Sequence, residues 1–408
     1  MTGMRIWVVN HYADPPEGLA TRTFDLARRW VEKGHPTTVF VCNLSHYNLK
    51  PVRRIGGLRM WLDEDIDGVR MVWLRAPGYT RNDWHRVLNM VTFSVLAVVA
   101  GLFRRPRPDV VIGVSVHPLA AFAGWVIAKL RGARFFFEVT DLWPETLIEF
   151  GMLPAASKRA RYMRRLESFL FRHSQRIVML WRHTDEYVES QGVSRDHIVW
   201  IPHGVELSRY DSLASYDGVA HNPFKVVFLG GFVSANSLDT ILDAAAELQK
   251  RGRKDVKVLL IGSGQDRDGV MDRARRLELD NVEFPTAVPK AEIWRAMALA
   301  DAFIYGLRDI PLYRYGISLN KLADYLASER PIIFFGRSSY DPVAEANAGF
   351  SVPPGDPVAI ADAIEKMVAL TPAERLAMGL RGRDYLMANH NIPNLAERYI
   401  GVLDTPAR

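Results

Sequence analysis

Residues Gly316–Ala327 read GISLNKLADYLA, and the apolar run Ile332–Phe335 follows after Arg330-Pro331. A glycine turn here opens onto the start of a helix, whose first backbone N–H groups have no partner within the helix and attract an oxyanion. Asp324 lies one turn further in, where its carboxylate can accept hydrogen bonds from a ribose. The order of turn, helix start, carboxylate and buried strand predicts a nucleotide-diphosphate pocket.

Apolar runs rich in β-branched residues alternate with helix-length segments along the whole chain, which is typical of parallel α/β sheets. In the first half we predict strands at residues 5–9, 37–42, 69–74, 109–114, 133–139, 176–180 and 197–201. The second series comprises residues 224–230, 256–261, 281–284, 301–304, 331–335 and 350–352. The sequence therefore predicts the α/β class, with two doubly wound domains facing each other across a cleft.

A chain of 408 residues is longer than one hydrophobic core usually organises, so two domains are expected. Residues 206–223 are polar and lack clear periodicity, and we interpret them as a linker between domains at residues 1–205 and 224–393. Residues 43–59 are expected to form a long polar loop, and residues 19–33 a helix. In the last segment, 394–408, apolar side chains recur on one helical side.

The composition excludes several kinds of protein. Hydrophobic residues make up 48% and charged residues 24%, which is ordinary for a soluble globular chain and not for a disordered one. Cys42 is the only cysteine, so no internal disulfide can form and a cytoplasmic location is favoured. The N-terminal run Arg5–Asn10 is too short for a signal peptide. Histidines are scattered and predict no metal site: His11, His85, His117, His173, His183 and His197.

Charge is unevenly placed. Through Val205 there are 28 Lys and Arg against 19 Asp and Glu, whereas the remainder has 24 against 27. No zinc-finger spacing or basic–aromatic RNA motif is present, so we predict no nucleic-acid partner and favour an anionic membrane surface or a lipid-phosphate acceptor. A merely solvated basic surface stays an alternative. Residues 87–103 are almost wholly apolar between arginines and predict a partly buried helix, while residues 157–172 predict an amphipathic basic helix.

Four further motifs occur in order along the chain: PPEGLATR at Pro15–Arg22, FFFEVTDLWPE at Phe135–Glu145, IPHGVE at Ile201–Glu206 and VLLIGSG at Val258–Gly264. Together with Gly316–Ala327 they resemble the retaining glycosyltransferases of family 4, in the branch typified by bacterial fucosamine transferases of O-antigen and capsule assembly. The resemblance covers essentially the whole chain. It implies a GT-B fold whose first domain binds the acceptor and whose second binds the nucleotide-sugar, with the last helix docked on the first domain.

The resemblance also implies roles for individual residues. Asp141 and Lys321 are the expected catalytic residues. The donor would be bound by Gly18, Gly230, Gly231, Asn236, Gly262, Ser318, Leu319, Asn320, Lys321 and Asp324. The acceptor side would comprise Arg22, His117, Thr140, Trp143 and Glu145. From the residues alone, Asp141 can instead cap a helix, Lys321 can be an exposed helix lysine, and His117 can be a structural histidine.

Departures from the family pattern bear on the mechanism. The arginine and lysine that clamp the donor pyrophosphate in relatives fall on Gly231 and Asn236, so Lys321 and the helix start at residues 318–320 must stabilise the leaving group. Losing one such donor typically costs about 3–4 kcal/mol of transition-state stabilisation. Thr140 stands where the family has a histidine. In this family the leaving phosphate is thought to take the acceptor proton, and basic residues and helix dipoles replace a metal.

The resemblance therefore implies a retaining, metal-independent hexosyltransferase without a cofactor, which moves a sugar from a UDP-linked donor to a lipid-linked or membrane-proximal glycan. We expect it in the cytoplasm or on the cytoplasmic face of the inner membrane. Two alternatives stay open: a catalytically silent GT-B partner protein, because Gly231 and Asn236 carry no charge, and a UDP-sugar epimerase, which shares the fold and the donor pocket.

Overall fold

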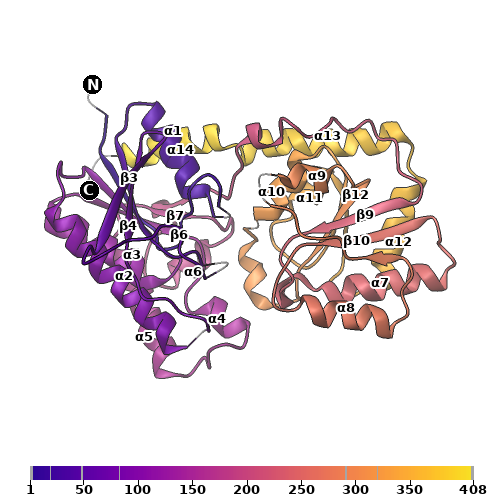
Figure 1. Cartoon of the computed structure of the whole chain (residues 1–408), viewed down its shortest axis with the longest axis horizontal. Coiled ribbons are helices and arrows are strands. Elements are labelled where there is room, and N and C mark those ends of the chain that lie inside the picture. The colour runs from indigo at the N-terminus through magenta and orange to yellow at the C-terminus, as the bar shows by residue number, and fades with distance from the viewer. Residues whose placement is uncertain are drawn as a thin grey trace. The chain divides into compact units, whose positions relative to one another are not determined.

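The computed structural model describes residues 3–18, 20–46, 49–81, 83–289, 292–318 and 320–405. It divides into two compact units, one comprising Met1–His203 with Ile392–Arg408 and the other Gly204–Asn391. Each unit carries its own, almost entirely parallel sheet, with helices on both faces (Figure 1). The predicted α/β class with two parallel-sheet domains is therefore confirmed.

The sheet of unit 1 has eight strands: β1 (Ile6–Val9), β2 (Thr37–Cys42), β3 (Trp61–Ile66), β4 (Val69–Leu74), β5 (Val110–Val114), β6 (Arg134–Val139), β7 (Ile177–Met179) and β8 (Ile198–Trp200). Their order is β3-β4-β2-β1-β5-β6-β7-β8, and β3 alone runs antiparallel to its neighbour. The other seven lie within one or two residues of their predicted ends, because strands buried on both faces read as continuous apolar runs.

We did not predict β3, which follows the expected polar loop. Asp67 and Gly68 join it to β4 with φ of 50° and 80°. Two consecutive left-handed residues form a tight hairpin turn, for which Asp-Gly is a favoured pair. The Asp67-Gly68 pair was the feature of the sequence that could have indicated a hairpin. The strand itself was not recognised because its consecutive acidic residues obscure the alternation of apolar and polar side chains.

The helices of unit 1 are α1 (Arg22–Glu32), α2 (Trp84–Phe103), α3 (Pro118–Arg131), α4 (Glu145–Glu149), α5 (Lys158–His173), α6 (Asp185–Glu189) and α14 (Ile392–Leu403). The helices α2, α3 and α5 cover one face of the sheet in that order, and α1 and α14 pair on the other (Figure 1). The predicted helices at residues 87–103 and 157–172 are α2 and α5.

The sheet of unit 2 has six parallel strands: β9 (Phe224–Leu229), β10 (Val256–Ile261), β11 (Val282–Glu283), β12 (Ala302–Gly306), β13 (Ile332–Phe335) and β14 (Gly349–Val352). Their order is β11-β10-β9-β12-β13-β14. The helices are α7 (Leu238–Lys250), α8 (Arg267–Arg276), α9 (Ile293–Met297), α10 (Asn320–Ala327), α11 (Pro342–Glu345), α12 (Pro357–Ala369) and α13 (Pro372–Asn389). Apolar side chains of α7, α8 and α12 form one core with the sheet, and α10 packs with α13.

Residues 206–223 are not a free linker, which corrects the predicted boundary. They belong to unit 2 and are bonded to it: the Tyr216 hydroxyl donates to the carbonyl of Asp301 at 3.2 Å, and Arg375 Nε donates to the carbonyl of Gly218 at 3.0 Å. The segment also bonds to carboxylates of unit 2, since the backbone N–H of His221 donates to Asp301 Oδ1 at 3.0 Å. These polar contacts leave no apolar periodicity in the sequence.

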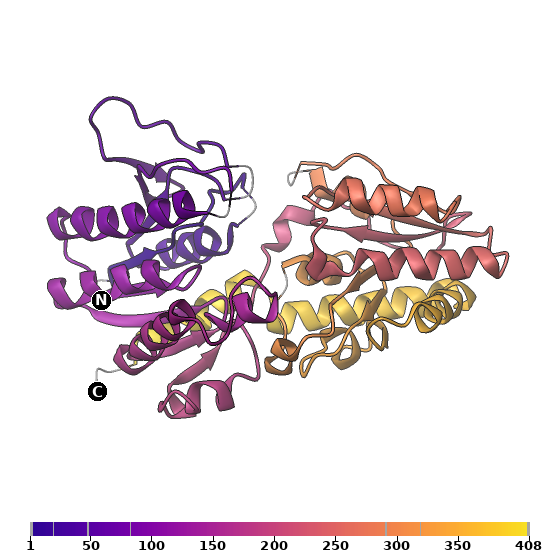
Figure 2. The ribbon, with the colours of Figure 1, turned by 90° about the horizontal axis from the view of Figure 1, so that it is seen from below.

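The chain end lies in unit 1, where Figure 2 shows the yellow helix α14 among the purple and magenta segments. Tyr399 is fully buried, and the Trp30 indole donates to the carbonyl of Ala396 at 3.3 Å. The helix begins at Ile392, two residues before the predicted start, and residues 406–408 lie outside the described part.

Candidate functional site

Two glycine loops meet at the carboxyl ends of β9 and β10 in unit 2. A Cβ on Gly262, whose φ is 150°, would lie 1.8 Å from the carbonyl oxygen of Gly230. The backbone N–H of Phe232 donates to the carbonyl of Ser263 at 2.8 Å. Only glycine fits at position 262 because the loops approach so closely. At Gly231, by contrast, a Cβ would have no neighbour nearer than 4.0 Å.

Lys321 lies beside these loops and has no anionic partner among the described residues. Its ammonium donates to Asn236 Oδ1 and stands 5.1 Å from the centre of the Phe228 ring. Asn236 Nδ2 in turn donates to the carbonyl of Gly231 at 2.6 Å. Burial lowers the pKa of Lys321 to about 7. A partly buried lysine held by an amide and a ring, with no described carboxylate beside it, is a site that an anion would complete.

The start of α10 is fixed against β9 close to Lys321. The Tyr325 hydroxyl donates to the carbonyl of Leu229 at 2.9 Å and accepts from its N–H at 2.8 Å. Gly316 turns the chain with φ of 101°, and Ser318 Oγ is buried without a hydrogen-bond partner in the described part of the chain. Asn320 is the first residue of the helix.

Two predicted donor-binding positions receive little description. Leu319 lies outside the described residues, as does the side chain of Asn320. Asp324 is placed on α10, where its Oδ1 accepts a hydrogen bond from the Tyr210 hydroxyl. Tyr210 comes from the segment expected to be a linker. A ribose would therefore share the carboxylate with Tyr210 or displace it.

In unit 1 the segment after β6 is held by several hydrogen bonds. The Trp143 backbone N–H donates to Glu167 Oε1 at 2.9 Å, its indole donates to the carbonyl of Ser115 at 2.8 Å, and the Thr140 N–H donates to Ser115 Oγ at 3.2 Å. Asp141 lies within this braced loop, partly exposed, and desolvation raises its pKa to about 6. Position 141 is not the cap of α4, whose N-cap residue is Pro144.

Side chains of α5 anchor the same loop. Glu145 pairs with Arg164 at 2.7 Å, so its carboxylate has a partner within the unit. Glu167 is buried, also accepts from the Tyr187 hydroxyl, and desolvation raises its pKa to about 8. We did not predict Glu167. The sequence could have indicated its burial, because Glu167 falls at helical spacing from Ala160 and Leu170, on the buried side of α5.

Two of the six histidines expected to be scattered, His11 and His117, meet in unit 1, which corrects the expectation for this pair. His11 Nδ1 lies 2.6 Å from His117 Nε2, and the His11 ring stacks on Phe93. His117 Nδ1 accepts from the Ala120 N–H at 3.2 Å and caps α3, so Nε2 carries the proton and donates to His11. Burial lowers the pKa of His117 to about 3 and that of His46 to about 4. The cluster is neutral at pH 7.

The glycine loop at Pro15–Arg22 is closed by its own hydrogen bonds. The Ala20 N–H donates to Asp14 Oδ2 at 3.0 Å, and a Cβ on Gly18 would lie 2.2 Å from the Asp14 side chain. Arg22 is buried, donates to the carbonyl of Ile201 at 3.1 Å and stands 3.5 Å from Glu138. Its contacts are inside the unit.

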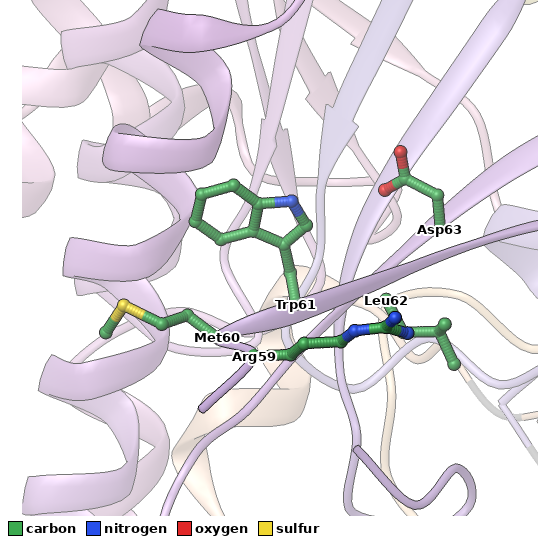
Figure 3. A pocket seen from close by; sticks show the side chains of 5 residues that line it. All are labelled: Arg59, Met60, Trp61, Leu62 and Asp63. Atoms are coloured by element: carbon green, nitrogen blue, oxygen red, sulfur yellow. The ribbon is translucent and has the colours of Figure 1, made fainter. Parts of the chain in front are cut away.

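A hollow of about 460 Å³ lies at the start of β3 and is lined by residues 59–63. Trp61 and Asp63 project from the same side of the strand (Figure 3). None of the predicted site residues lines it. Among the described residues, no three His, Cys, Asp or Glu side chains are grouped as a metal site requires.

Comparison with known families matches two adjacent stretches of the chain. Residues 17–204 match the glycosyl transferase 4-like domain, and residues 223–369 match glycosyl transferases group 1. The probable glycosyltransferase WbjE of Pseudomonas aeruginosa is 24% identical over 65% of this chain and 68% of its own. The putative colanic acid biosynthesis glycosyl transferase WcaI of Escherichia coli K12 is 20% identical over 67% and 69%.

Solved structures are similar over nearly the full length. The sucrose-phosphate synthase of Thermosynechococcus elongatus has a TM-score of 0.75 at 16% identity and covers 98% of each chain. Anabaena HepE, solved in complex with UDP and glucose, has a TM-score of 0.68 at 12% identity and covers 99% of this chain and 100% of its own. At these identities the likeness concerns the fold.

Proposed function

The chain is a GT-B glycosyltransferase, a glycosyl transferase 4-like domain followed by a group 1 domain, and from that premise we propose that it transfers a sugar from a UDP-linked donor, with retention, to a glycan acceptor at the cell envelope. The observation that carries the proposal is Lys321: a partly buried cation, bonded to an amide, with no anionic partner among the described residues, next to two glycine loops and a helix start.

The donor diphosphate would bind at the N-terminus of α10, in contact with the Lys321 ammonium and the free backbone N–H groups of the first turn. Unpaired N–H groups of a helix start and a nearby ammonium both favour negative charge. Ser318 Oγ, buried without a partner in the described part, is a further donor for a phosphate oxygen. This arrangement would take the place of the arginine and lysine that Gly231 and Asn236 do not supply.

In the proposed reaction the acceptor oxygen forms a bond to the anomeric carbon while the bond from that carbon to the diphosphate oxygen breaks. The acceptor proton passes to an oxygen of the leaving diphosphate. Lys321 and the helix start stabilise the charge that develops there. Asp141, ionised above pH 6, would orient the acceptor hydroxyl or stabilise positive charge at the anomeric carbon. No step requires a metal.

Support for the substrates comes from relatives. HepE was solved with UDP and glucose, which favours a UDP-linked hexose donor. WcaI is named for colanic acid biosynthesis, which favours an acceptor in polysaccharide assembly. We further propose that the transfer takes place at the cytoplasmic face of the inner membrane.

The test is to incubate the purified protein with a panel of UDP-sugars and follow the anomeric signals by NMR, with and without a lipid-linked glycan acceptor. The proposal predicts slow release of UDP without acceptor and a product with the anomeric configuration of the donor. Inversion would refute retention. Absence of both hydrolysis and transfer with every nucleotide-sugar would refute the assignment as a transferase. Epimerisation of the UDP-sugar without acceptor would identify the protein as an epimerase instead.

A further inference from the structure

The outer side of α2 is apolar and exposed over the first part of the helix and again at its last residue. Large apolar side chains between 42% and 79% exposed recur every three or four residues from Trp84 to Val95, and Phe103 ends the helix: Trp84, Val87, Leu88, Val91, Val95 and Phe103. We call this set the α2 face. A helix on the surface of a soluble domain normally turns charged or polar residues to water. On α2 there is no acidic residue after the N-cap Asp83.

The opposite side of α2 is part of the core of unit 1. Phe93, Ala97 and Ala100 are buried, and Asn89 Nδ2 donates to the carbonyl of Pro77 at 2.8 Å. A Cβ on Gly101 would lie 3.1 Å from Ile127 of α3, so the two helices approach closely. By length and composition α2 could cross a membrane, with a mean hydropathy of 1.9, but 33% of that stretch is buried against its own unit. A helix packed in this way can lie on a bilayer and cannot cross it without leaving the sheet.

Basic residues border the α2 face. Arg81 precedes the helix, and Arg105 and Arg107 follow it, all exposed. On the same face of the sheet, α5 exposes five more cations: Lys158, Arg159, Arg161, Arg165 and Arg172. Between them, Trp125 of α3 and Phe169 of α5 pack edge to face with ring centres 4.8 Å apart. The layer α2–α3–α5 (Figure 1) therefore combines an apolar strip with a positive border.

We infer that the α2 face docks on an anionic lipid bilayer. Apolar side chains would enter the boundary between headgroups and acyl chains while the arginines and the α5 cations contact anionic headgroups. Trp84, 66% exposed at the start of the helix, is a residue type enriched at that boundary. A second copy of the chain is a poorer occupant, because a two-fold contact through this layer would bring positive borders together. The inference does not depend on the donor chemistry.

The test is flotation of the full chain with two kinds of vesicle, one of phosphatidylcholine alone and one that also contains about 30 mol% phosphatidylglycerol. The anionic lipid gives the second kind a negative surface potential. We expect flotation with the anionic vesicles, weakened by salt and reversed by alkaline carbonate. The double variant Val91→Glu with Val95→Glu should bind at least tenfold less. Its matched control is Val358→Glu on α12, where valine is 48% exposed, and this variant should bind as the parent does.

Three further measurements keep the outcomes distinct. Lys321→Ala should float normally, and the Val91/Val95 variant should keep its thermal melting point and UDP affinity. Arg161→Glu with Arg165→Glu should lower flotation and its salt dependence. The inference is overturned if the parent does not float, if the Val91/Val95 variant floats as well as the parent, if carbonate fails to release the protein, or if light scattering shows a dimer that this variant dissolves while vesicle binding is absent.

Discussion

The affinity for UDP should depend on pH through Lys321. Burial lowers the pKa of its ammonium to about 7 from an ordinary 10.5, and no described carboxylate compensates. A bound diphosphate supplies negative charge and returns the pKa toward its ordinary value. Binding is therefore linked to proton uptake: it is strongest where Lys321 is already protonated, below pH 7, and weakens as pH rises through the pKa of the free protein.

The magnitude follows from the protonated fraction of the free protein. That fraction falls from about a quarter at pH 7.5 to about a hundredth at pH 9, whereas the complex stays protonated, so Kd should rise about 20-fold, or ~1.8 kcal/mol. The charge of the diphosphate itself is constant in this range, since its terminal phosphate has a pKa of about 6. At pH 8 each UDP should take up roughly 0.9 proton.

The assay is isothermal calorimetry at pH 7.5, 8 and 9 in two buffers of different ionisation enthalpy. Lys321→Arg is the matched control, because a guanidinium stays charged throughout, and its Kd should change by less than about threefold. Lys321→Ala should bind weakly at every pH. A parent Kd that is constant between pH 7.5 and 9, with no proton uptake, would refute the placement of the diphosphate at Lys321.

Three other predictions concern separate parts of the molecule. Asp324→Asn should weaken UDP binding in calorimetry by about 1–3 kcal/mol, while Tyr210→Phe, which removes only the hydroxyl bonded to that carboxylate, should not; equal affinities of both variants and the parent would restrict Asp324 to a structural role. Because the pKa of Asp141 is raised to about 6, its carboxylate is lost as pH falls, and kcat/KM should decline below pH 6; a rate unchanged from pH 7 to 5 would exclude a need for the ionised form. Tyr399→Ala empties a fully buried site on α14 and should lower the free energy of unfolding by about 3–5 kcal/mol in urea titration, whereas Glu397→Ala, at an exposed ion pair with Lys33, should change it by under about 1 kcal/mol; similar losses in both variants would contradict a load-carrying α14.

The sequence predicted the fold best at strands that are covered on both faces of a sheet. Strands such as Ile332–Phe335 are continuous apolar runs because both faces are covered, and their ends were predicted within one or two residues. The strand Trp61–Ile66 at the edge was missed because three of its six residues are acidic, and two of these, Asp63 and Asp65, are exposed. The segment at residues 206–223 was taken for a linker because it is held by isolated polar contacts to carbonyls and carboxylates, which leave no periodic pattern in a sequence.

The candidate sites likewise contain residues that the sequence pointed to and contacts that it could not show. Lys321 and the glycines at positions 230 and 262 were expected to belong to one site from the family resemblance, and the structure places them side by side. Pairings between distant segments were not expected: His11 with His117, Tyr210 with Asp324, and Glu167 with the Trp143 backbone. Each joins residues 20 or more positions apart, so only the fold brings them together.

The measurement that tests the central claim most directly is a crystal structure of the protein with UDP. The account predicts the diphosphate within hydrogen-bonding distance of Lys321 Nζ and of the backbone N–H groups at the start of α10, with the ammonium turned from Asn236 toward a phosphate oxygen. UDP bound elsewhere, or bound here with Lys321 still donating only to Asn236, would contradict it.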